Sequence, residues 1–177
     1  MNKKLLVLTL LFLITKTSWG QIKTEIDNGI FVNFPSKPEY KTTTQSSSYT
    51  FKSENCIFMA LILRNAIPNY AEFVKAKKTW SESEYKKVAD AFLDNTVKGK
   101  LGYTNNTGQV IETKMGEFYG RKISYSAINP TTGTRGKRFS IIYLVRDKLI
   151  SFEVWYTNDI SASNTEKDNF LNSINTK

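Results

Sequence analysis

The sequence contains no histidine, and this absence removes several kinds of catalytic and metal site at once. Ser-His-Asp and Cys-His nucleophile pairs need an imidazole as the general base, and many zinc sites need it as a ligand. No serine lies in a Gly-x-Ser-x-Gly elbow, and the glycines at 133 and 136 are too closely spaced for a phosphate-binding P-loop. The residues therefore predict no catalytic residue, no metal site and no cofactor.

Cysteine and proline are also scarce. The single cysteine, Cys56, excludes an intramolecular disulfide, so the stability of the fold must come from packing. Cys56 opens the apolar run 56–63, where a buried, inert thiol is favoured over a nucleophile because free cysteine commonly packs as a small hydrophobic residue. Four prolines are too few for a linker-rich architecture.

The first residues are typical of a secretory signal peptide. A basic start, Asn2 to Lys4, precedes an apolar run over 5–14 that is too short to cross a bilayer. The small residues Ser18 and Gly20 favour cleavage after Gly20. We expect a signal peptide at 1–20 and a single domain at 21–177, periplasmic or secreted, without a transmembrane anchor in the mature form; an uncleaved N-terminal anchor is the alternative.

Positive charge exceeds negative charge. Loss of the three leader lysines lowers the formal net charge from +9 to +6. In an exported protein this charge favours an anionic envelope component or an envelope protein as partner, and the leader argues against nucleic acid. No pattern in the sequence indicates an oligomeric state.

Hydrophobic periodicity predicts a series of antiparallel strands. We expect a first strand over 29–35 that ends at a proline, and a hairpin in which 49–51 pairs with 56–63. The polar stretch 42–48 is either an edge strand or a loop. The strand at 56–63 is apolar on both faces, which predicts a central strand covered on both sides. Four further strands are expected; they are 109–115, 121–127, 138–145 and 149–156.

Two capping boxes and a change of period predict helices. Ser81 and Glu84 precede apolar residues at helical spacing, which indicates a helix over 82–98 after a shorter one at 70–78. Ser163 and Glu166 indicate a final helix over 163–173. Together these elements predict an α+β fold, with an antiparallel sheet of about six strands sandwiched between helices.

This order of elements resembles the PsbP-like superfamily. The resemblance rests on an opening strand that ends in Phe34-Pro35, the amphipathic helix, the meander and the closing segment 170–174, Phe-Leu-Asn-Ser-Ile. The superfamily includes the extrinsic PsbP proteins of photosystem II and bacterial envelope proteins such as DcrB. The resemblance implies a binding or accessory module, and no ligand residue of those proteins matches a position in this chain.

The main function hypothesis is an exported, non-enzymatic binding or accessory module of the cell envelope. Its candidate binding residues are Arg135, Lys137 and Arg138, because arginine forks fit carboxylate or phosphate groups and a hairpin loop projects toward a partner. The glycines of 129–136 suit a long hairpin turn with positive φ.

Two alternatives remain open. A small-ligand carrier would use a pocket between sheet and helix, with aromatic residues such as Trp80, Tyr119 and Trp155 in its wall. A carboxylate-based hydrolase would use Glu117 and Glu153. A second acidic pair, Asp90 and Asp94, is expected instead to form i,i+4 ion pairs with the lysines at 86 and 98.

Overall fold

The computed structural model describes residues 20–177 except 103, 105–106, 129–132 and 134, so nearly all of the expected signal peptide lies outside the described residues. The described elements are, in chain order, β1 (Ile22–Asp27), β2 (Ile30–Phe34), β3 (Glu39–Thr42), β4 (Ser46–Lys52), β5 (Cys56–Leu63), α2 (Tyr70–Lys77), α3 (Glu82–Gly102), β6 (Gln109–Met115), β7 (Phe118–Ile128), β8 (Arg135–Val145), β9 (Lys148–Tyr156), α4 (Ser161–Leu171) and β10 (Asn175–Thr176).

The strands form an α+β fold with two antiparallel sheets. The large sheet has seven strands in the order β3-β4-β5-β9-β8-β7-β6, and the small sheet has the order β1-β2-β10. The expected hairpin and the four-strand meander are confirmed, since β4 pairs with β5 and β6 to β9 pair in sequence. The expected count of about six strands is wrong, because β3 extends the large sheet and β1, β2 and β10 form a separate one.

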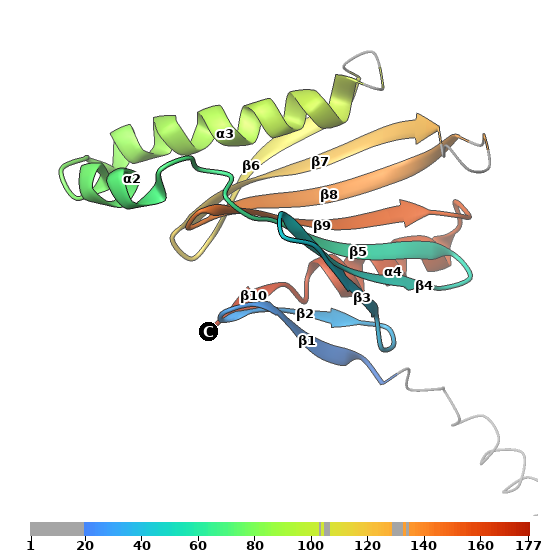
Figure 1. Cartoon of the computed structure of the whole chain (residues 1–177). Helices are drawn as coiled ribbons and strands as arrows, with labels where there is room; N and C mark the ends of the chain where they lie inside the picture. The colour runs from blue at the N-terminus through green and yellow to red at the C-terminus, as the bar shows by residue number, and fades with distance from the viewer. Residues whose placement is uncertain (1–19, 103, 105–106, 129–132, 134) are drawn as a thin grey trace, which may run out of the picture.

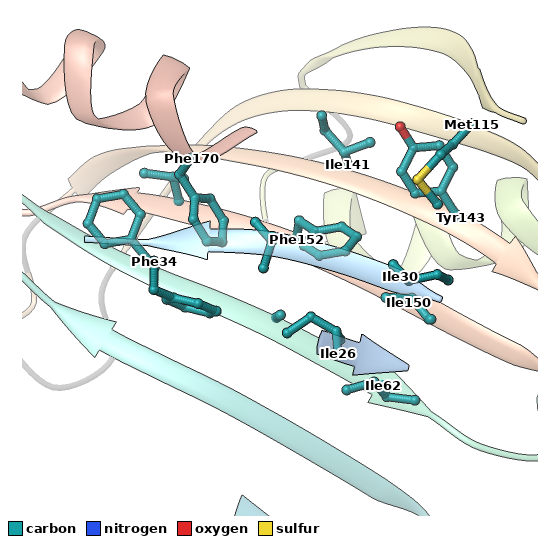
Figure 2. Packing of buried hydrophobic residues seen from close by; sticks show 14 of the residues in the cluster. Ile26, Ile30, Phe34, Ile62, Met115, Ile141, Tyr143, Ile150, Phe152 and Phe170 are labelled. Carbon is teal, nitrogen blue, oxygen red and sulfur yellow. The ribbon is translucent and has the colours of Figure 1, made fainter. Parts of the chain in front are cut away.

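The first face of the large sheet packs against the small sheet and α4, not against helices alone as expected (Figure 1). Three phenylalanines from different elements meet there. The ring of Phe170 in α4 lies 5.1 Å from that of Phe34 in β2 and 5.2 Å from that of Phe58 in β5. Figure 2 shows Phe34 and Phe170 in this core beside Phe152 of β9. Cys56 is fully buried in the same cluster, which confirms the expected burial, and burial raises the pKa of its thiol to about 12, which favours an inert thiol over a nucleophile.

The second face carries α3, with α2 beside its first turns (Figure 1). The expected capping box is confirmed, since the backbone N–H of Ser81 donates to Glu84 at 2.7 Å and that of Glu84 donates to the Ser81 hydroxyl at 3.3 Å. The buried stripe of α3 packs on β7 and β8; it consists of Ala89, Leu93, Val97 and Leu101. This stripe continues beyond the expected end at 98, so the helix runs to Gly102.

Arg121 of β7 joins α3 to the sheet through charge. Its side chain is almost fully buried and donates to Asp90 at 2.8 Å and to Asp94 at 3.0 Å. The expected pair between Lys86 and Asp90 is confirmed at 2.8 Å. Asp94 pairs with Arg121 and not with the lysine at 98, because an arginine buried under the helix needs a carboxylate partner.

The final helix begins earlier than expected. It starts at Ser161, and Glu166 accepts hydrogen bonds from the side chains of Ser53 and Asn55 in the β4–β5 turn. The predicted capping box of Ser163 with Glu166 is therefore wrong, because Glu166 ties α4 to the sheet instead of capping its own helix. The Ser163 hydroxyl donates to the carbonyl of Asn158.

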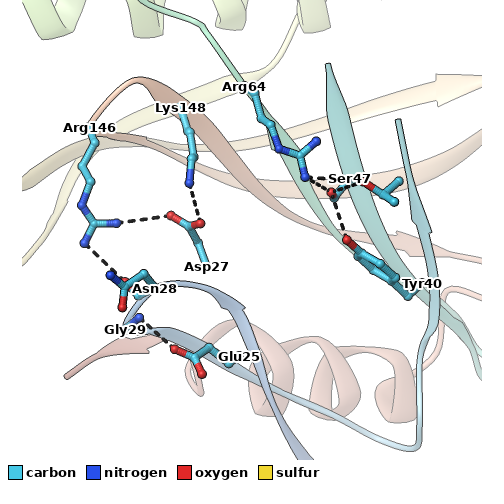
Figure 3. A network of polar contacts seen from close by, with 10 residues as sticks. Glu25, Asp27, Asn28, Gly29, Tyr40, Ser47, Arg64, Arg146 and Lys148 are labelled. Carbon is cyan, nitrogen blue, oxygen red and sulfur yellow. Dashed lines mark hydrogen bonds and ion pairs between the residues drawn. The ribbon is translucent and has the colours of Figure 1, made fainter. Parts of the chain in front are cut away.

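Another charged contact, separate from that of Arg121, joins the small sheet to the large sheet. Asp27, at the end of β1, accepts hydrogen bonds from Lys148 at 2.6 Å and from Arg146 at 3.3 Å (Figure 3). Arg146 lies in the β8–β9 turn with φ of 56°, a conformation that costs a non-glycine residue free energy. The contact with Asp27 helps to offset that cost at the position where the small sheet meets the large one.

Replacement of Phe170 by alanine is expected to lower the free energy of unfolding by about 3–5 kcal/mol, because the side chain is fully buried against two other rings. Equilibrium denaturation measures the change. Val74→Ala is the control, since Val74 is exposed on α2 and its loss should change stability by no more than about 0.5 kcal/mol. Equal effects of the two substitutions would contradict this description of the core.

Candidate functional site

The second face of β5 is not fully covered. The residues of β5 that face the small sheet and α4 are all buried; they are Cys56, Phe58, Ala60 and Ile62. Those on the α3 side are partly exposed, and Leu63 is 47% exposed. The expectation that both faces of this strand are covered is therefore wrong. The helix packs mainly on β7 and β8 and so covers β5 only in part.

The uncovered surface continues into a groove between the C-terminal half of α3 and the sheet. The groove has a volume of about 840 Å³ and a mainly apolar surface. Residues of α3, β5, β7, β8 and β9 line it; they are Leu61, Thr96, Gly99, Lys100, Tyr125, Ala127, Ile128, Arg138, Glu153 and Trp155. The pattern of the strands explains this composition, because Tyr125, Arg138 and Trp155 are direct cross-strand neighbours on β7, β8 and β9.

Glu153 lies in the groove lining with a side chain only 3% exposed. One carboxylate oxygen accepts from the ammonium of Lys100 on α3 and, at 2.8 Å, from the hydroxyl of Ser151. The other accepts from the indole N–H of Trp155 at 3.0 Å. Both carboxylate oxygens are thus engaged, and the hydrogen bond to Glu153 holds the indole of Trp155 in the groove wall.

The pKa of Glu153 lies below its ordinary value. Burial alone would raise this pKa, but the charge of Lys100 and the hydrogen bonds from Lys100, Ser151 and Trp155 outweigh burial. The carboxylate is therefore ionised at neutral pH, and the groove holds a neutralised ion pair instead of an isolated charge.

A second hollow, of about 500 Å³, adjoins the groove. The two hollows share Ala127, Arg138 and Trp155. The guanidinium carbon of Arg138 lies 3.8 Å from the centre of the Trp155 ring, in a cation–π contact. One of its N–H groups donates to the carbonyl of Ile128 at 3.0 Å.

The structure brings the three basic residues predicted from the sequence to this second hollow. Arg135, Lys137 and Arg138 all line it, and Lys137 forms an ion pair with Asp159 at 2.9 Å. They belong to β8 and not to a projecting loop, because β8 begins at Arg135. Of the two glycines expected to permit positive φ, Gly133 has a φ of 69°, whereas Gly136 pairs with Ala127 in the sheet. The rest of the predicted turn, 129–132 and 134, lies outside the described residues.

The structure separates the other residues singled out in the sequence. Trp80 and Tyr119 line a hollow of about 230 Å³ at the start of α3, away from Trp155. Glu117 lines that same hollow, so it does not share a pocket with Glu153. Among the described residues, no three acidic or cysteine side chains are gathered as metal ligands would be.

The sequence patterns did not single out Thr96, Gly99 and Lys100, which form the helical side of the groove. One signal pointed to Lys100: Glu153 is a charged residue within an apolar strand, and a buried carboxylate needs a cation. Nothing in the sequence indicated which of the many lysines supplies it. Gly99 carried no signal, because an isolated helical glycine has many explanations.

No protein-family model and no curated protein matches this chain. Within the described ranges of the chain, no helix combines the length and the apolar character needed to cross a membrane.

Replacement of Glu153 by glutamine is expected to flatten the acid dependence of stability. Because the folded-state pKa is lowered, the carboxylate stabilises the fold above its unfolded value of about 4.3, and this stabilisation is lost as the pH falls through the folded value. Glu153→Gln should also lower the free energy of unfolding at pH 7 by about 1–3 kcal/mol, because Lys100 loses its charged partner.

The measurement is denaturant unfolding between pH 7 and pH 2. Glu117→Gln is the matched control, since that side chain is 72% exposed and should keep the wild-type acid dependence. If the free energy of unfolding of Glu153→Gln falls with decreasing pH as steeply as that of the wild type, the Lys100–Glu153 pair does not govern stability in acid.

Proposed function

We propose that this protein is an exported, non-enzymatic binding protein that holds a small apolar ligand in the groove between α3 and the large sheet. One observation carries the proposal. An apolar hollow of about 840 Å³ lies beside a strand whose apolar face is left partly exposed. This volume falls within the range of about 300–1,000 Å³ that is usual for small-molecule sites.

The polar groups of the groove suit binding better than catalysis. The carboxylate of Glu153 accepts three hydrogen bonds, and Lys100 is occupied by that carboxylate. Such groups fix the shape of a site and are poorly placed to transfer protons. The hydrolase alternative has less support, because Glu117 and Glu153 line separate hollows.

Export and the PsbP-like relationship remain part of the proposal. The leader pattern at 1–20 supports export to the periplasm or beyond. The α+β architecture with antiparallel sheets is compatible with the resemblance noted above, and that superfamily provides binding modules. Binding of a small ligand in the groove would be the function of this module, and it is compatible with an envelope protein as a further partner.

The groove can be filled without disturbing the fold. A Cβ atom added at Gly99 would meet no heavy atom within 4 Å, and the residue is exposed within α3. Gly99→Phe should therefore place a ring over the groove while leaving the core intact. We expect it to weaken binding of the neutral fluorescent probe N-phenyl-1-naphthylamine by about tenfold or more, equal to about 1.4 kcal/mol.

Fluorescence titration of the probe gives the affinity and the stoichiometry, with one site expected per chain. Gly102→Phe is the matched control, because Gly102 lies on the same helix, has the same open surroundings and does not line the groove. Absence of saturable binding to the wild-type protein, or equal affinity in Gly99→Phe, would overturn the proposed function.

A further inference from the structure

One end of the groove adjoins the second hollow, which is lined by basic side chains. Among the described residues, four basic side chains line the adjoining hollow, and the acidic residue there is Asp159. Lys137 neutralises Asp159. The remaining basic residues are Lys52, Arg135 and Arg138, so the hollow carries an excess of positive charge.

The strand register puts these charges in line with the groove. Arg138, Trp155, Ile57 and Lys52 are successive cross-strand neighbours on β8, β9, β5 and β4. Neighbouring strands are about 4.8 Å apart, so two apolar side chains lie between two cationic ones along this row. A ligand beside Trp155 therefore lies on the row between Arg138, the direct neighbour of Trp155, and Lys52, which is two strands away.

Arg138 is the residue where the two environments meet. Its guanidinium carbon lies 3.8 Å from the centre of the Trp155 ring, so the cation is held over that ring at the boundary between the groove and the basic hollow. One donor is used by the Ile128 carbonyl and the Tyr125 hydroxyl interacts with the same guanidinium, which has five donors in all. Such a fork matches the geometry of a carboxylate or a phosphate.

We propose that the natural ligand is an amphiphilic anion, with its apolar body in the groove and its carboxylate or phosphate head group beside Arg138 in the basic hollow. This inference rests on the proposed function and adds the chemical class of the ligand. Binding combines burial of the apolar body with a charge-assisted contact at one end, so neither part alone accounts for the affinity.

The test compares ligands that share one chain length and differ in the head group. Decanoate, decyl phosphate, decanol and decyltrimethylammonium are each titrated against N-phenyl-1-naphthylamine bound to the wild-type protein, below their micellar concentrations. We expect at least one anion to bind about tenfold more tightly than decanol, and the cation to bind most weakly. The comparison of decanoate with decyl phosphate decides which head group is preferred.

The same series is measured in Arg135→Gln/Arg138→Gln, where the ratio of anion affinity to decanol affinity should fall to about threefold or less. Raised salt should lower that ratio in the wild-type protein, because part of the contact is electrostatic. Lys122→Gln is the control, since Lys122 lies on β7 outside both hollows and its loss should keep the wild-type ratio.

The possible failures are distinct. Equal binding of decanol and both anions, tightest binding of the cation, or an unchanged ratio in the double variant would overturn the inference and leave the proposed function standing. If none of the four compounds displaces the probe, or the probe itself does not bind, both proposals fail. A thermal unfolding curve of each variant checks that it is folded, so that a lower ratio of anion affinity to decanol affinity does not result from unfolding.

Discussion

The ion pair between Lys100 and Glu153 sets the position of the C-terminal half of α3, and the groove depends on that position. A carboxylate buried in β9 must have a cation, and here the cation comes from the helix and not from the sheet. Arg121 does the same for the N-terminal half with the charges reversed, since the buried cation is on the sheet and its carboxylates are on the helix. With both halves fixed over β7 to β9, α3 leaves the second face of β5 only partly covered.

Much of the fold could be predicted from local patterns. The strands of the meander and the hairpin have clear apolar periodicity, and the start of α3 has a capping box that acts within four residues. These features are local, so a single sequence contains enough information to place them. The small sheet was not predicted, because β10 contains only two residues and β1 only two isoleucines.

The remaining differences arise from contacts between distant segments. The residue pattern of β5 is apolar on both faces, but whether a helix covers the second face depends on where α3 is anchored, and its anchors lie on other strands. Glu166 fits a capping box by spacing, yet it binds side chains more than a hundred positions earlier in the chain. The basic residues at 135–138 could be recognised as a group, whereas their neighbour Trp155 was known only after the register of β8 and β9 was determined.

The two faces of β5 serve different purposes, and this alternation affects how the sequence can vary. Residues at even positions, such as Phe58 and Ile62, hold the core together, whereas odd positions such as Leu61 face the groove. Successive side chains of a strand point to opposite faces, so a change at an odd position need not disturb the core. Under the proposed function, selection for a new ligand can therefore act on every second residue of this strand, while selection for folding acts on the others.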